Sequence, residues 1–204
     1  MIVTKIEAVT KTRFKVYVDE QFAFVLCKGE LSRYHVAVGQ EIEDGVYHKI
    51  LKEVILKRAK LRALHLLNTM GRTESQLRQK LKMSGYTDEI TEEAISYVKS
   101  FGYINDDAYA RNYIENRKGK KSKKELYAQL VQKGLDRNVI DQAFEECYEK
   151  EDTKEAIAEI LRRKKYDPES ADYKETQKIL GFLTRKGFAY DDIRQVIQVS
   201  EWNA

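Results

Sequence analysis

The sequence contains a single proline, Pro168, and only ten glycines among its 204 residues. An all-β sandwich depends on frequent turns built from these two residue types, so the composition excludes that fold for the body of the chain. No stretch approaches the roughly 18 uninterrupted apolar residues of a membrane-spanning helix. The start, MIVTKIEAV, does not read as an export signal. We therefore expect a cytoplasmic protein without a membrane segment.

Residues that usually carry chemistry are equally scarce. Cys27 and Cys147 match no metal-binding spacing, which favours a reduced, intracellular chain. His35, His48 and His65 form neither a cluster nor an H-E-x-x-H motif, and there is no G-x-S-x-G elbow. We predict no catalytic residue, no cofactor and no metal, and we expect a binding protein. An enzyme is the least favoured alternative, and it would require turnover of a substrate by the isolated chain.

Charge is plentiful but nearly balanced. Charged residues make up 34% of the chain, and the formal net charge is +4. The excess lies in the middle, because residues 56–165 hold 24 basic and 18 acidic side chains. This mild basicity fits a protein that works near nucleic acid, and it fits ordinary solubility equally well.

The first 27 residues predict three short strands. The segments IVTKIEAV, RFKVYVD and FAFVLC are rich in Val, Ile, Phe and Tyr, and polar turns at 9–13 and 19–21 separate them. A three-stranded sheet needs a cover for its apolar face, and residues 28–55 are expected to supply it. Residues 1–55 are therefore predicted to form a small α+β subdomain.

From about residue 50 the apolar period becomes helical, and one pattern occurs three times. Two apolar residues stand eight and four positions before a glycine, which indicates one helical face that ends in a left-handed residue. A second apolar pair follows the glycine, and another helical stretch precedes each copy, at 56–70, 106–117 and 152–165. The three copies are Leu77, Leu81, Gly85, Ile90 and Ala94; Leu126, Leu130, Gly134, Val139 and Ala143; and Ile179, Leu183, Gly187, Ile193 and Val196.

These copies predict three-helix repeats at residues 56–104, 105–150 and 151–204. The fold class is then mainly α, with tandem three-helix repeats in an elongated curved array after the strand-rich subdomain. The less favoured alternative is one compact all-α domain.

The stretch SFGYINDDAYARNYIENRKGKKSKK, residues 100–124, contains an acid pair that invites a catalytic interpretation. Asn105 is a natural N-cap, which places Asp106 and Asp107 in the first helical turn, where the helix dipole favours negative charge. Ile104 and Tyr109 then occupy the positions of a hydrophobic staple. The acid pair is therefore predicted to be structural.

The basic run that follows lacks the spacing of a phosphate-binding loop. Ser122 is predicted to cap the next helix, with Glu125 completing a capping box. The remaining cations form either a solvated link or a patch for phosphates or an acidic protein surface, and a second basic run recurs after the first helix of the third repeat. The candidate patch consists of Arg111, Arg117, Lys118, Lys120, Lys121, Lys123, Lys124, Arg162, Arg163, Lys164 and Lys165.

The segment GYINDDAYARNYIENRKGKKSKKELYAQLVQKGL resembles the central region of the RecX family, the bacterial regulators of the recombinase RecA. LHLLNTMGRTESQLRQKLKMSGY is similar to the family's opening unit, and the match covers about residues 56–200. Many members have Gly-Pro where this chain has Ser122 and Lys123. The motif positions are Tyr103, Ile104, Asp106, Asp107, Tyr109, Ala110, Arg117, Leu130, Lys133 and Gly134.

The resemblance implies an architecture of tandem three-helix repeats and a partner. RecX proteins bind RecA, lie in the groove of its filament on single-stranded DNA, and limit filament growth, strand exchange, ATPase and coprotease activities, which affects DNA repair and the SOS response. We expect an elongated monomer. One rival is a helical protein that binds DNA directly, with strong salt dependence. The other is a partner scaffold in which charge reversal at Lys120, Lys121, Lys123 and Lys124 has no effect.

Overall fold

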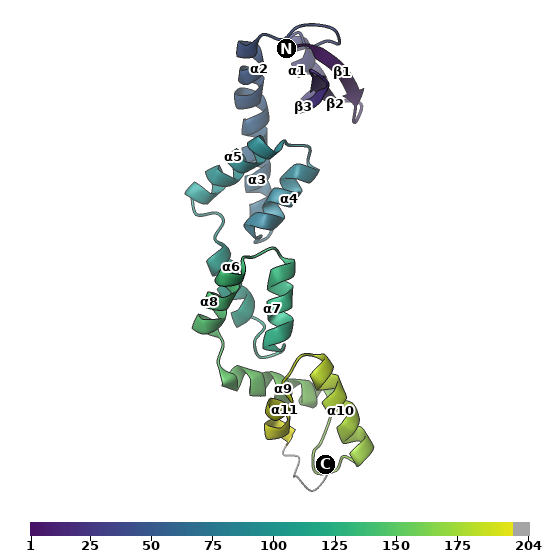
Figure 1. Ribbon diagram of the computed structural model, residues 1–204, viewed down its shortest axis with the longest axis vertical. Helices are drawn as coiled ribbons and strands as arrows, with labels where there is room; N and C mark the ends of the chain where they lie inside the picture. Colours follow the sequence, from purple (N-terminus) through teal and green to yellow (C-terminus); the bar gives the residue numbers. More distant parts are fainter. Residues whose placement is uncertain (198–204) are drawn as a thin grey trace. The chain divides into compact units, whose positions relative to one another are not determined.

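The computed structural model describes residues 1–197, so residues 198–204 of the predicted third repeat lie outside the described part (Figure 1). The chain divides into two compact units, Met1–Asn105 and Asp106–Ala204. The predicted elongated, curved arrangement and the four-part division both stay predictions.

The first unit opens with the predicted three-stranded antiparallel meander. Strands β1 (Val3–Ala8), β2 (Arg13–Val18) and β3 (Gln21–Cys27) pair in the order β1-β2-β3. A register shift interrupts the β2–β3 pairing after Val16. Val16, Phe24 and Leu26 are almost fully buried, so one face of the sheet belongs to a core.

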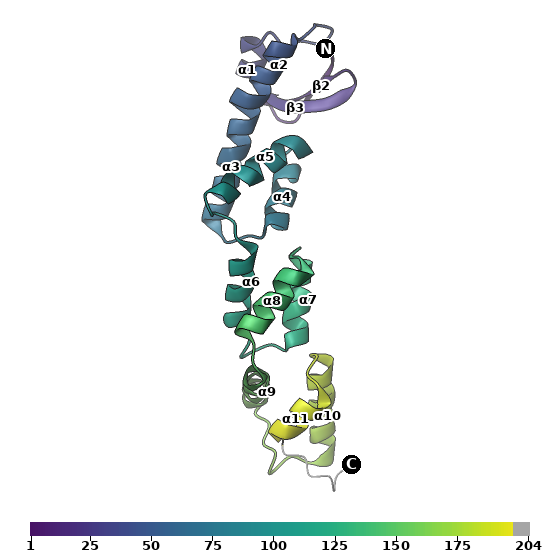
Figure 2. The same cartoon turned by 60° about the vertical axis from the view of Figure 1, so that its left-hand side comes forward.

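A nearly continuous helical rod covers that face. After α1 (Lys28–Arg33), helix α2 (Asp44–Ile50) passes through the π-helical turn η1 (Leu51–Leu56) into α3 (Lys57–Thr69), as Figure 2 shows. Tyr47 of α2 packs its ring 5.6 Å from the ring of Phe24, and Ile50 is fully buried. The prediction that residues 28–55 cover the sheet is confirmed.

The same rod also begins the first repeat. Ala59 and Ala63 of α3 are fully buried against α4 (Glu74–Met83) and α5 (Asp88–Ser100). The sheet, the rod and these two helices share one continuous hydrophobic cluster. Residues 55 and 56, where the predicted subdomain gives way to the predicted first repeat, lie within this rod.

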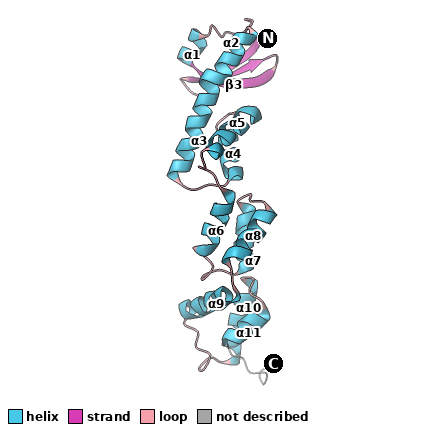
Figure 3. Cartoon of the chain, turned by 90° about the vertical axis from the view of Figure 1, so that its left-hand side faces the viewer, coloured by secondary structure: helices cyan, strands magenta, loops and turns pink. Residues whose placement is uncertain are grey.

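The second unit contains two three-helix groups. The first comprises α6 (Asp106–Glu115), α7 (Lys123–Gln132) and α8 (Arg137–Cys147), and the second comprises α9 (Lys150–Lys164), α10 (Tyr173–Arg185) and α11 (Tyr190–Ile197). In each group the first helix packs on the third, as α3 packs on α5. The two groups have separate hydrophobic cores. Within residues 1–197, Figure 3 shows strands only in the first unit.

The repeat pattern accounts for these cores. Both apolar positions before the glycine are buried in all three copies. Gly85, Gly134 and Gly187 all have positive φ, from 79° to 90°, as predicted for the residue that ends the middle helix. Val139 and Val196 pack against the cores of their repeats but are only partly buried, and the next residue of each helix, Ile140 or Ile197, is buried more deeply.

Candidate partner interface

The basic loop between α6 and α7 packs on the start of α9. The Nζ atom of Lys118 donates a hydrogen bond to the carbonyl of Cys147 at 2.9 Å and lies 3.4 Å from the carboxylate of Asp152. Burial opposes the charge of Lys118, but Glu115 and Asp152 raise its pKa above the ordinary value. Lys118 therefore serves as an internal tie between the second and third repeats.

An acidic face of α9 meets this loop. Asp152, Glu155 and Glu159 are spaced by three and four residues, so they share one side of the helix. A Cβ on Gly119 would lie 3.4 Å from the Glu155 carboxylate. This acidic spacing was visible in the sequence, but nothing in the sequence indicated that it would face the basic loop.

Glu159 lies between the two predicted basic runs. Its carboxylate accepts hydrogen bonds from Arg163 at 2.8 Å and Arg162 at 2.5 Å. The hydrogen bond from Arg163 lowers the pKa of Glu159 most. Burial opposes it, but the charges of Arg162, Arg163 and Lys120 add to the lowering, and the net pKa lies below its ordinary value. The structure thus brings cations of both runs around one carboxylate.

Ser122 joins the two repeats through its side chain. It caps α7, as predicted, by accepting a hydrogen bond from the Glu125 backbone N–H at 3.1 Å. Its hydroxyl also donates to the carbonyl of Lys186 at 2.5 Å. The predicted capping box is not formed, because the Glu125 carboxylate bonds instead to Lys121 at 2.6 Å and to Gln129 at 3.1 Å.

Gly187 completes this contact. A Cβ at this position would lie 3.0 Å from the Cβ of Lys124 and 3.1 Å from the Ser122 hydroxyl oxygen. The glycine that ends the middle helix of the third repeat is therefore also the point where the second repeat approaches its backbone. In the first unit, a Cβ on Gly85 would lie 3.5 Å from Val25 of the sheet.

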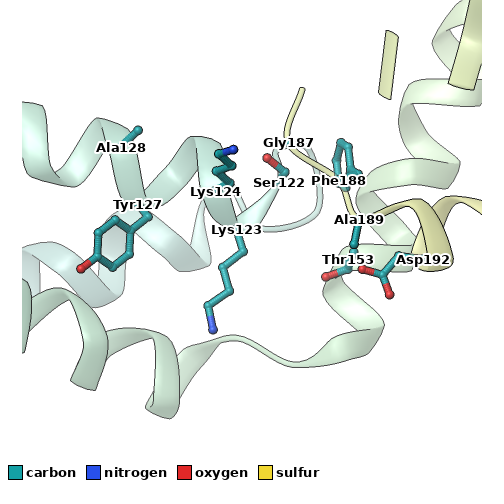
Figure 4. Close-up of a pocket in the computed structure, with 10 residues that line it drawn as sticks. All are labelled: Ser122, Lys123, Lys124, Tyr127, Ala128, Thr153, Gly187, Phe188, Ala189 and Asp192. Carbon is teal, nitrogen blue, oxygen red and sulfur yellow. The ribbon is translucent and has the colours of Figure 1, made fainter. Parts of the chain in front are cut away.

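A pocket of about 500 Å³ opens beside this joint. Figure 4 shows Ser122 next to Gly187, with Lys123 and Lys124 pointing to opposite sides. The ammonium of Lys123 lies 5.3 Å from the ring centroid of Phe144, at cation–π distance. Lys123 and Lys124 are both exposed, so they still present positive charge to solvent.

The remaining candidate cations have other neighbours. Arg111 pairs with Glu146 at 3.1 Å, and the guanidinium of Arg117 lies 4.1 Å from the ring centroid of Tyr113. At the end of α9, Lys164 lies 4.2 Å from the ring centroid of Phe182. Much of the candidate patch is therefore engaged within the protein, and its role in partner binding stays a prediction.

The motif residues occupy structural positions. Asp106 and Asp107 lie in the first turn of α6, as predicted. Ile104 is buried in the core of the first unit, whereas Tyr103 is exposed. In the second unit the Tyr109 ring stacks on Tyr113 at 6.1 Å. The rest of the set are core residues or turn residues: Ala110 and Leu130 are fully buried, and Gly134 has positive φ.

Neither cysteine nor any acid cluster suggests a reactive centre in residues 1–197. Cys27 and Cys147 are both unpaired and partly buried, and burial raises the pKa of the Cys147 thiol. Within the described residues, no three His, Cys, Asp or Glu side chains gather as a metal ion would require. No helix in this part of the chain is long and apolar enough to cross a membrane.

Comparisons with known proteins agree with this architecture. The RecX family descriptions match in chain order: the first three-helix domain at residues 59–97, the second at 105–143 and the third at 151–197. The Regulatory protein RecX of Clostridioides difficile is 30% identical, over 96% of this chain and 94% of its own length. That of Caldanaerobacter subterraneus subsp. tengcongensis is 28% identical, over 98% and 100%.

Solved structures give the same result. A crystal structure of regulatory protein RecX superposes with a TM-score of 0.62 at 26% identity, and it covers 97% of this chain and 99% of the other. The crystal structure of RecX from Lactobacillus salivarius has a TM-score of 0.57 at 26% identity, over 70% of this chain and 94% of the other. The three-helix repeats and the near full-length similarity show that the chain belongs to the RecX family of regulatory proteins.

Proposed function

We propose that this protein binds the RecA filament on single-stranded DNA and limits its growth, ATPase activity, strand exchange and coprotease activity. The observation that carries the proposal is the alignment with regulatory RecX proteins over nearly the whole chain, with the three-helix domains in the same order. Regulation of this kind needs only occupancy, because a bound protein can block filament extension or the route to duplex DNA.

Repeated three-helix units suit a polymeric target. Contacts made by separate repeats to successive protomers act together, so the assembled filament is bound more tightly than free recombinase. The exposed cations Lys120, Lys123 and Lys124 can face acidic protein surface or DNA phosphate.

The first experiment adds substoichiometric protein to the cognate RecA on single-stranded DNA and measures ATPase activity and strand exchange. We expect both rates to fall at ratios well below one protein per RecA protomer. Unchanged rates in both assays would remove the proposal.

A second experiment tests exposed cations in the basic loop and in the first turn of α7. The double variant Lys120→Gln and Lys124→Gln removes two charges and keeps polar side chains. We expect weaker inhibition than by wild type, with the largest difference at low salt, because raised salt screens the charge contacts of wild type as well. Arg137→Gln, which removes an exposed charge at the start of α8, is the matched control and should inhibit like wild type. Equal inhibition by the double variant would favour binding surfaces elsewhere in the chain.

Direct DNA binding is the alternative function, and titration of a labelled oligothymidylate without RecA addresses it. Direct action on DNA predicts tight binding. The logarithm of its association constant should fall linearly with the logarithm of the salt concentration, with a slope of about −0.7 per phosphate contacted. The proposed function predicts that RecA must be present for strong binding.

A further inference from the structure

A second basic site lies at the C-terminal end of α9. There the loop of residues 165–172 and one face of α10 enclose a pocket of about 400 Å³. Four cations line it: Lys164, Lys165, Lys178 and Arg185. Lys178 and Arg185 were not among the candidates that the sequence suggested, because they stand apart from any basic run.

The pocket is held open by local structure. Lys165 has φ +54° and turns the chain out of α9, and the Tyr166 backbone N–H bonds back to the carbonyl of Leu161 at 3.1 Å. The Tyr166 hydroxyl lies 3.1 Å from the hydroxyl of Thr176 on α10. Lys178 and Arg185 are seven residues apart, so they project from the same side of α10.

The floor of the pocket is apolar. Ile179 is 6% exposed and contributes to the core of the third repeat, and Phe182 packs partly buried beside it. The ammonium of Lys164 lies over the ring of Phe182. An incoming apolar side chain would therefore meet Ile179 and the edge of Phe182.

The charges of this pocket are only partly compensated. In the described part of the chain, none of its four cations lies within 4.0 Å of a carboxylate, whereas Arg162 and Arg163 just before them both pair with Glu159. Two acids also line the pocket, and one of them, Asp167, bonds to Ser170 of its own loop at 2.8 Å. Four cations against two acids leave a net charge of +2.

We infer that this pocket receives an acidic segment of a partner protein, in which one apolar side chain is flanked by carboxylates. The apolar side chain occupies the floor at Ile179, and the carboxylates pair with Lys178 and Arg185 at the rim. Arg185 is suited to bidentate carboxylate recognition.

A protein segment fits better than a nucleic acid strand. The face of Phe182 lies under Lys164, so it offers no open platform for a base. Glu175 and Asp167 in the lining also repel a continuous run of phosphates, whereas a peptide can place its few carboxylates at the cations alone. This inference rests on the proposed function in one respect: the acidic segment would belong to the recombinase.

The test measures binding of a fluorescein-labelled peptide, with one leucine flanked by aspartates, to the full chain by anisotropy. The same peptide with asparagines and a labelled oligothymidylate are the comparison probes. We expect the aspartate peptide to bind and Lys178→Glu with Arg185→Glu to weaken it at least about tenfold, as the loss of two charge-assisted contacts predicts. Lys174→Glu, an exposed change on α10 outside the pocket, should bind like wild type.

A neutral pair, Lys178→Gln with Arg185→Gln, is measured beside the reversal, and thermal unfolding monitors the fold of each variant. The inference is overturned if the aspartate peptide does not bind wild type, or if both folded pairs bind it like wild type. It is also overturned if the oligothymidylate binds more tightly and responds to the same substitutions.

Inhibition assays separate this inference from the proposed function. If wild type inhibits RecA and the folded neutral pair inhibits several-fold less, both stand. If both proteins inhibit equally, the pocket inference fails while the proposed function remains. If wild type does not inhibit, the proposed function fails, and the peptide result alone decides whether the pocket recognises acidic segments.

Discussion

The two units join their parts in different ways. In the first unit, the sheet and the first repeat share a single hydrophobic core that continues along one helical rod. In the second unit, the second and third repeats keep separate cores and meet through polar groups, chiefly Ser122, Lys118 and the backbone of Gly187.

This difference has consequences for cooperativity. Burial of shared apolar surface couples two parts strongly, because neither can open without exposing the core of the other. A joint of a few hydrogen bonds and ion pairs contributes only about 1 kcal/mol per contact. We therefore expect the first unit to open as a whole and the two repeats of the second unit to open more independently.

The largest expected effect comes from Leu26→Ala. Leu26 is fully buried on β3, and truncation of such a residue costs about 2–5 kcal/mol. Because the core is shared, hydrogen exchange should accelerate in β3 and equally in α5 of the first repeat. Leu183→Ala in the third repeat is the comparison, and it should leave the core helix α8 of the second repeat mostly protected. Acceleration confined to the sheet would contradict the shared core.

Gly187→Ala should have the next largest effect. A left-handed conformation costs a non-glycine residue about 1–2 kcal/mol, and here the new Cβ also meets Lys124 and Ser122. Gly39→Ala is the control, since Gly39 has φ +81° with nothing within 4 Å of the Cβ position. We expect Gly187→Ala to lower the thermal stability of the second unit by more than the control lowers that of the first. Equal losses of thermal stability for the two variants would mean that Lys124 and Ser122 move aside for the new Cβ at no cost.

Ser122→Ala tests the polar joint with a smaller change. Loss of an N-cap costs about 1 kcal/mol, and this substitution also deprives the Lys186 carbonyl of its donor. Asp172→Ala removes the cap of α10, a carboxylate that accepts a hydrogen bond from the Glu175 backbone N–H of the same helix. Hydrogen exchange should accelerate at both α7 and the end of α10 for Ser122→Ala, but only at α10 for Asp172→Ala.

The smallest expected effect is an acid sensitivity of the first unit. Burial raises the pKa of Glu30, but the backbone of Cys27 and the guanidinium of Arg58 outweigh it, so the net pKa lies below the ordinary 4.5. The stabilisation is therefore present above pH 4.5 and is lost as the pH falls through the lowered folded-state value. Because solvent screens the Glu30–Arg58 pair, its contribution to the free energy of unfolding is about a fraction of a kcal/mol. In Glu30→Gln, the protection of the β3 amides against hydrogen exchange should depend less on pH than in wild type.

Some features of the candidate interface followed from local sequence. Ser122 was recognisable as a cap because a helical period begins just after it, and Asp106 and Asp107 as first-turn acids for the same reason. The partners of the basic loop were not recognisable. Lys118 meets Asp152, and Ser122 meets Lys186, only because two repeats pack together. Lys178 and Arg185 lie on the polar side of the amphipathic helix α10, and their spacing alone does not mark a pocket.

The sequence by itself determined the repeat: apolar residues four apart followed by a glycine specify a helix face and its left-handed end, because both are local properties of the backbone. Only the tertiary structure decided which cations are engaged and which face solvent. Charge pairing depends on distances between segments far apart in the chain, and no periodicity encodes those distances. For the same reason, the fusion of the sheet with the first repeat emerged only from packing.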